Sequence, residues 1–211
     1  MSKIAFNLSS FSANQAGVKV HITNITGHLS FPNSTLYLYI CKDSINLLEN
    51  NFVKNSKIIF LPFSSKNKLL KLFYEQIYIP LHALLNNIRV IHSFDYSGPI
   101  FFWGCKTITI HDLNYINNKE TFSFTQRLVR YLLYPLGIKK ANIVFTISNT
   151  IKNEILNIFK YRNLENKIGV IHNGYEHLIS NSGEVSKEYD IQAPFFVSVG
   201  SLNPHKNYIR L

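Results

Sequence analysis

Hydrophobic residues gather in seven short runs that alternate with longer stretches of mixed polarity. Several runs are almost continuously apolar and rich in β-branched residues, a pattern typical of strands buried on both faces of a parallel sheet. The predicted strands are Ile4–Leu8, Thr35–Cys41, Lys57–Leu61, Arg89–His92, Thr107–Ile110, Ile143–Ile147 and Ile168–Ile171.

Helical periodicity occupies several of the intervening stretches. Apolar residues recur on one helical face of residues 149–161, and further helices are predicted over 122–140 and over 66–87, the last interrupted at Pro80. Strands that alternate with helices indicate βαβ units with right-handed crossovers. The fold class is therefore predicted as α/β, a Rossmann-like parallel sheet with helices on both faces and ligands at the carboxyl ends of the strands.

The chain changes from mainly apolar to mainly polar residues near its end, which predicts a domain boundary. We expect residues 1–175 to form the Rossmann-like domain and the polar residues 176–194 to form an interdomain linker. Residues 195–211 then supply one further apolar strand and a loop. Because a lone strand leaves an edge and an apolar face uncovered, we expect this second domain to be truncated.

The charge balance favours an anionic partner. The 22 Lys and Arg residues outnumber the 12 Asp and Glu residues, for a net charge of +10. Nucleic acid, a phospholipid surface and a phosphorylated substrate would each suit this charge. The sequence contains no recognised nucleic-acid-binding motif, so a nucleic-acid partner is not expected. Residues 66–74 combine Lys with Leu and Phe, and fit either an ordinary amphipathic surface helix or a segment lying on an anionic membrane.

Localisation follows from the apolar patterning. No run of eighteen apolar residues occurs, and the first residues lack the order of a signal peptide. We therefore expect a cytoplasmic protein.

Three places after predicted strands hold candidate chemistry. The turn of residues 9–17 is rich in Ser, Asn, Ala and Gly, and is either an anion cradle or a plain flexible turn. His111 and Asp112 follow a strand at the predicted ligand edge, where they contact a ligand or simply hold the loop. Lys206 follows the last apolar run, and is either a diphosphate contact or an ordinary surface Lys.

Five segments together resemble the retaining GT-B glycosyltransferases of family 4, especially bacterial mannosyltransferase-like members of polysaccharide and lipopolysaccharide pathways. The segments are Gln15–Val18, Thr109–Leu113, Ala141–Asn149, Lys167–Gly174 and Phe196–Asn207. The first four would belong to the N-terminal domain of the GT-B fold, and the last to the start of the C-terminal domain.

The resemblance implies roles for four residues. His111 would contact the transferring sugar near the reacting carbon, and Asp112 accompanies it at the binding site. The loop at Gly17 would approach donor and acceptor, and Lys206 would neutralise the donor diphosphate. Many members carry an Arg where this chain has Ser201, and the family's pair of glutamates is expected beyond Leu211.

The resemblance also implies a function. It predicts a hexosyltransferase that moves a hexose such as mannose, with retention, from a GDP- or UDP-linked sugar to a lipid-linked, oligosaccharide or polysaccharide acceptor. No cofactor beyond this donor is implied, and no Asp-x-Asp motif suggests a metal. The enzyme would work at the inner face of the cytoplasmic membrane, as a peripheral protein. We expect the 211 residues alone to be inactive; the alternative is a catalytically inactive protein that binds a glycan or a lipid phosphate.

Overall fold

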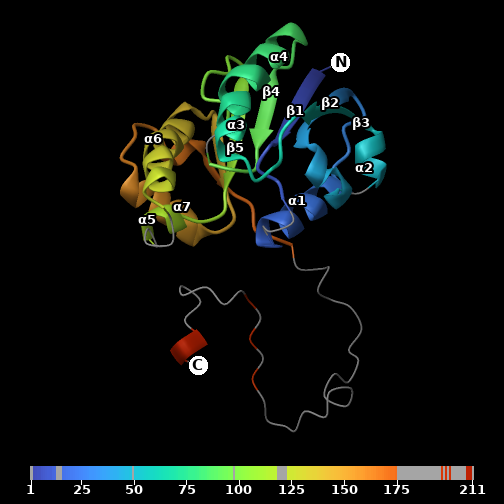
Figure 1. Cartoon of the computed structure of the whole chain (residues 1–211). Coiled ribbons are helices and arrows are strands. Elements are labelled where there is room, and N and C mark those ends of the chain that lie inside the picture. Colours follow the sequence, from blue (N-terminus) through green and yellow to red (C-terminus); the bar gives the residue numbers. More distant parts are fainter. Residues whose placement is uncertain are drawn as a thin grey trace, which may run out of the picture. The chain divides into compact units, whose positions relative to one another are not determined.

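Seven parallel strands form one sheet with the spatial order β3-β2-β1-β4-β5-β6-β7 (Figure 1). The strands are β1 Ser2–Leu8, β2 Ser34–Cys41, β3 Ser56–Leu61, β4 Val90–Ser93, β5 Cys105–Ile110, β6 Ile143–Thr146 and β7 Ile168–Val170. Every neighbouring pair is parallel. The apolar runs of the sequence predicted each strand to within two residues at either end.

The computed structural model describes residues 2–12, 16–48, 50–96, 98–117, 123–174, 196, 198, 200 and 208–210. The chain divides into two units, Met1–Asn173 and Gly174–Leu211. The sheet lies entirely in the first unit. The predicted linker lies outside the described residues, and the predicted strand and loop at 195–211 lie largely outside them, so the proposed domain boundaries stay predictions.

Helices connect the strands. They are α1 Ala16–His28, α2 Asn50–Lys54, α3 Lys68–Phe73, α4 Ile79–Leu85, α5 Asn114–Asn117, α6 Phe124–Lys140 and α7 Asn149–Ile158, with 3₁₀ turns η1 Lys42–Leu47, η4 Glu165–Lys167 and η7 Tyr208–Arg210. Ser123 and Ser148 begin α6 and α7, because each side chain accepts a hydrogen bond from a backbone N–H three residues later.

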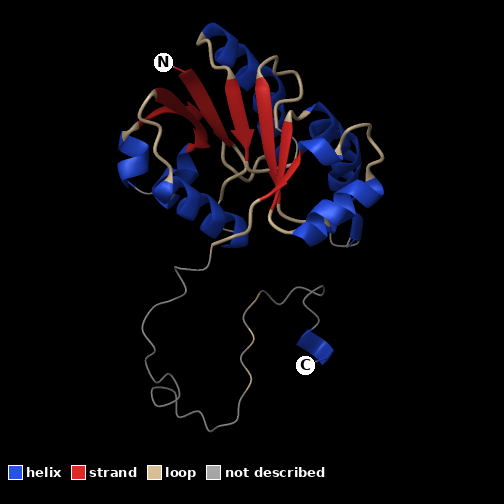
Figure 2. Cartoon of the chain, turned by 180° about the vertical axis from the view of Figure 1, so that it is seen from behind, coloured by secondary structure: helices blue, strands red, loops and turns tan. Residues whose placement is uncertain are grey.

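The helices cover both faces of the sheet, as predicted (Figure 2). Phe6 of β1 points to the face where Ile22 of α1 and Phe52 of α2 pack. Its neighbour Ala5 points to the opposite face, against Ile79 of α4. This alternation follows from the two-residue period of a strand. The helices α6 and α7 pack on β5, β6 and β7 through a third apolar cluster.

The helix predicted over residues 66–87 is not broken at Pro80. The segment stays helical by widening to a π-helical turn, η2 Tyr74–Tyr78, directly before α4. Pro80 then lies in the first turn of α4. The helix is continuous at this point, since the N–H of Ile79 donates to the carbonyl of Tyr74, whereas Pro80 has no N–H to donate and follows directly after the wider turn. The predicted interruption is therefore a change of helix type.

Candidate active site

The carboxyl ends of β1, β4 and β5 lie at one edge of the sheet, where the strand order reverses. β2 and β4 flank β1 on opposite sides, so the connections leave this point in opposite directions. Such a switch point is where open α/β sheets bind ligands. Ser9 follows β1, Asp95 lies two residues beyond β4, and His111 directly follows β5.

His111 is held neutral at this edge. Burial and the neighbouring imidazole of His21 lower its pKa to about 4, against the opposing effect of Asp95 and Asp112. Its Nε2 atom is buried and has no hydrogen-bond partner among the described residues. A buried polar atom without a partner calls for an explanation such as a ligand or a water. A neutral imidazole can accept a hydrogen bond from a hydroxyl group or donate one to it.

His21 is the residue that the sequence analysis missed. It lies on α1, is 8% exposed, and its Nδ1 lies 2.8 Å from Oδ1 of Asn173. Its ring packs against the ring of His111. A signal was present in the sequence, because His21 lies three residues after Val18 and four before Ile25, two residues of the buried face of α1.

Asp112 is engaged by its own loop. Its Oδ1 accepts a hydrogen bond from the Tyr96 hydroxyl and another, of 2.9 Å, from the backbone N–H of Asn114. The second bond caps the start of α5. Asp112 therefore ties three segments together at the edge of the sheet: the ends of β4 and β5, and α5. Its predicted role in substrate binding stays a prediction.

The structure places Gly17 but not Lys206. Gly17 is the second residue of α1 and is exposed, and no atom lies within 4 Å of the place that a Cβ would occupy. Among the described residues this leaves the backbone of Gly17 open, and Gly17 lies one helical turn before His21. Lys206 lies outside the described residues.

Buried polar groups lie beside the histidines at the ends of β1 and β4. Asn7 of β1 donates from Nδ2 to Oε1 of Glu75 at 2.7 Å and to Oγ of Ser93 at 3.2 Å. Its own Oδ1 accepts from the N–H of Ser9. Glu75 is 1% exposed. These bonds fix the turn that leaves β1, although the buried Oγ of Ser9 itself has no partner among the described residues.

A basic group borders the same edge. Lys68 of α3 has a lowered pKa, because of burial and then because of the positive charges of Arg130 and Lys71. Arg130 belongs to α6, so two helices bring like charges together here. Close cations of this kind favour an anionic ligand.

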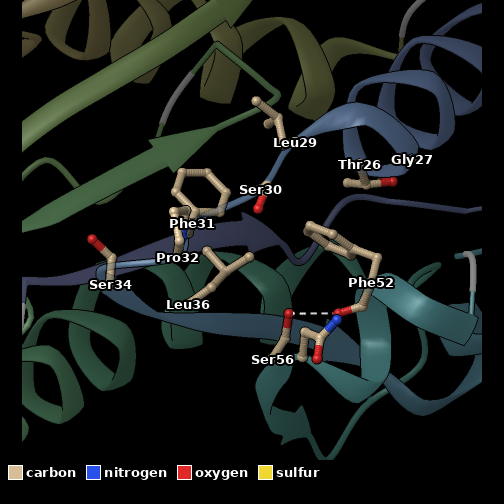
Figure 3. Close-up of a pocket in the computed structure, with 11 residues that line it drawn as sticks. Thr26, Gly27, Leu29, Ser30, Phe31, Pro32, Ser34, Leu36, Phe52 and Ser56 are labelled. Atoms are coloured by element: carbon tan, nitrogen blue, oxygen red, sulfur yellow. Dashed lines mark hydrogen bonds between the residues drawn. The ribbon is translucent and has the colours of Figure 1, made fainter.

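A surface cavity of about 450 Å³ lies elsewhere (Figure 3). Thr26 near the end of α1, Ser34 at the start of β2 and Ser56 at the start of β3 line it. Because the strands are parallel, their starts lie at the edge opposite His111. The cavity is therefore separate from the candidate site. In the described part of the chain, no group of three His, Cys, Asp or Glu side chains is placed to hold a metal ion.

Residues 16–177 match the model of Glycosyltransferase Family 4. The chain belongs to glycosyltransferase family 4. Of the predicted site residues, Gly17, His111 and Asp112 lie inside the family match, as does His21.

Relatives of this family 4 chain include a curated protein and two solved structures. It is 29% identical over 102 residues to the O-antigen chain mannosyltransferase RfbU of Salmonella typhimurium, a match that spans 48% of this chain and 26% of the relative. A glycosyltransferase from Rickettsia africae aligns with a TM-score of 0.41 and 15% identity, over 91% of this chain and 50% of that one. The lipopolysaccharide outer core galactosyltransferase WaaB aligns with a TM-score of 0.45 and 14% identity, over 82% and 46%.

The family 4 chain thus spans about a quarter of the curated relative in its match and about half of each aligned structure. Among the helices that the structure describes, none combines the length and the apolar character needed to cross a bilayer.

Proposed function

We propose that this chain forms the acceptor-side half of a hexosyltransferase that uses a GDP- or UDP-linked hexose, such as mannose, and transfers it with retention. The bond from the anomeric carbon to the diphosphate oxygen breaks, and the nucleoside diphosphate leaves with the electron pair. A bond from that carbon to an acceptor hydroxyl oxygen forms, and the hydroxyl proton passes to the leaving diphosphate or to water. The observation that carries the proposal is His111 at the switch point of a family 4 domain: it is neutral, and its buried Nε2 has no partner in the described part of the chain.

His111 would hold a hydroxyl of the transferring sugar in the geometry that the reaction needs. A hydrogen bond that forms best in the transition state raises the rate, because only such differential binding lowers the barrier. Gly17 would leave space for the substrates, and Lys206 would neutralise the diphosphate. The reaction would need the nucleotide-sugar donor and no further cofactor. Asp112 would keep the loop of His111 in place through Tyr96.

The acceptor would be a lipid-linked sugar or a polysaccharide at the inner face of the cytoplasmic membrane. Two observations support this proposal. Lys68 and Arg130 provide positive charge beside the site, suited to a lipid phosphate. Apolar side chains at every fourth position of α3, η2 and α4 are 48% exposed or more, and form a stripe of Leu69, Phe73, Ile77, Leu81 and Leu85.

A transfer assay tests the function. The 211 residues, and the same residues with any continuation of their reading frame, are incubated with labelled GDP-mannose or UDP-hexoses and membrane lipid extracts. We expect the longer product to transfer the label, and the 211 residues to be inactive. His111→Asn should lower transfer about a hundredfold without unfolding the protein. The one-bond carbon–proton coupling at the anomeric carbon of the product, compared with that of the donor, reports retention.

A matched variant makes the assay specific. His82→Asn replaces a histidine of α4 that bonds Tyr39 away from the site, and should leave transfer intact. Sugar binding without turnover by any form of the protein would instead favour a binding protein for a glycan or a lipid phosphate.

A further inference from the structure

The rings of His21 and His111 meet edge to face. Their centroids are 4.8 Å apart and their planes are inclined by 86°. His21 comes from α1, whereas His111 follows β5, so two separate elements bring them together. His111 gains no orientation from its Nε2, because that atom has no hydrogen-bond partner among the described residues. Packing against His21 is therefore one of the contacts that set the angle of its ring.

Asn173 fixes the protonation pattern of His21. The Oδ1 atom of Asn173 can only accept, so Nδ1 of His21 carries the proton across the 2.8 Å contact. The Nε2 atom of the neutral His21 ring then carries a lone pair, and it too is buried without a partner among the described residues. Asn173 thus determines both the tautomer and the tilt of the His21 ring.

Aromatic neighbours also pack against the ring of His21. Phe94 packs on His21 with ring centroids 6.1 Å apart, and on His92 with centroids 4.4 Å apart. His92 is itself held by hydroxyls, with Nδ1 2.7 Å from Oγ1 of Thr107 and Nε2 3.2 Å from Oγ1 of Thr109. A ring packed on such a fixed support has little freedom to turn.

We propose that His21 is a positioning residue for His111, and that Asn173 holds His21 in this role. The proposal goes beyond the proposed function by adding a residue, and rests on it for the role of His111. Asn173 is the last residue of the first unit. The path of the chain at the end of that unit therefore influences the orientation of the imidazole that would contact the sugar.

Nuclear magnetic resonance of the histidine ring nitrogens in the 211-residue protein tests the proposal without any sugar. In the unmodified protein, His21 should show a proton on Nδ1. Asn173→Leu replaces the accepting amide with an apolar side chain of similar size. The Nδ1–H signature of His21 should therefore be lost, and the ring resonances of His111 should shift. Asn173→Asp restores an accepting oxygen and should restore the Nδ1–H signature.

A matched control separates positioning from general loosening. Asn142 accepts a bond of the same length, 2.8 Å, from the N–H of Lys106 near the start of β5. Asn142→Leu should leave the rings of His21 and His111 unchanged. His21→Phe keeps a ring but loses the Nδ1–H, and it should also shift the resonances of His111. This variant keeps the test available if Asn173→Leu fails to fold.

Two results would overturn the proposal: a His21 ring protonated on Nε2 in the unmodified protein, or His111 resonances that stay in place in folded Asn173→Leu and His21→Phe. Neither result bears on the proposed function, which the transfer assay of His111→Asn tests separately.

Discussion

The ammonium group of Lys71 lies 2.6 Å from Oδ2 of Asp95, and the two side chains are only 17% and 18% exposed. Burial alone would lower the pKa of Lys71, but the carboxylates of Asp95 and Glu75 outweigh it and raise that pKa. Burial alone would raise the pKa of Asp95, and Lys71 lowers it instead. Both groups are therefore charged, and each depends on the other.

Removing one partner of this pair should destabilise the protein strongly. Lys71→Met leaves the carboxylate of Asp95 without its counter-charge, which should cost about 3 kcal/mol in the free energy of unfolding. The double variant Lys71→Met with Asp95→Leu should recover most of that loss. Urea unfolding measures both, with the exposed Lys42→Met as a control. Additive losses in the double variant would show that the two residues act independently.

The pair also shows what the sequence leaves open. Residues 66–74 fit either an amphipathic surface helix or a segment lying on an anionic membrane, and the structure turns Lys71 to Asp95 while Leu69 is 79% exposed. The spacing of the apolar residues predicted the helix but not which side chains it buries. A helix takes its direction from contacts with distant segments, here the loop after β4, and these are not visible in local spacing.

The strands were easier to predict than the site. A strand buried on both faces is mostly apolar along its length, so the seven apolar runs specify seven strands. His111 and Asp112 were chosen as candidates because they directly follow such a run. The helical spacing places His21 on the buried face of α1, but its contact with Asn173, at the far end of the unit, is visible only in the folded sheet.

Stability should fall as the pH decreases below about 6.5. Burial and the imidazoles of His21 and His111 lower the pKa of His92 to about 3, and that of His111 is lowered to about 4. Below pH 6.5 these histidines bind protons in the unfolded chain but stay neutral in the folded chain, so acid favours unfolding. Each histidine contributes a slope of up to about 1.4 kcal/mol per pH unit.

Urea midpoints at several pH values between 7.5 and 4.5 would measure this slope. His92→Gln should flatten it, because the variant has no proton to take up in the unfolded state, although it also loses hydrogen bonds to Thr107 and Thr109. A midpoint that stays constant over this range would contradict the prediction.

The exposed stripe along α3, η2 and α4 should bind anionic membranes. Leu69→Ser with Phe73→Ser removes two side chains that are 79% and 52% exposed, so folding should be little affected. Because each buried apolar side chain contributes about 1.5 kcal/mol or more, binding to vesicles containing phosphatidylglycerol should weaken more than about tenfold. Co-sedimentation measures the bound fraction.

Ile158→Ser is the matched control for this surface, since Ile158 of α7 is 41% exposed and lies outside the stripe. It should bind as the unmodified protein does. Equal binding to vesicles of phosphatidylcholine alone would show that the positive charge beside the stripe has no part in the contact.

Asp112 should matter more for the shape of its loop than for charge. Asp112→Asn keeps a side-chain oxygen that can accept from Tyr96 and from the N–H of Asn114, so the free energy of unfolding should change little. Asp112→Ala leaves the largely buried Tyr96 hydroxyl without this acceptor and removes the cap of α5, which should cost about 2 to 3 kcal/mol. Urea unfolding separates the two variants. If Asp112→Asn abolishes sugar transfer while stability is retained, the carboxylate itself acts at the binding site, in line with the donor or acceptor contact predicted from the sequence.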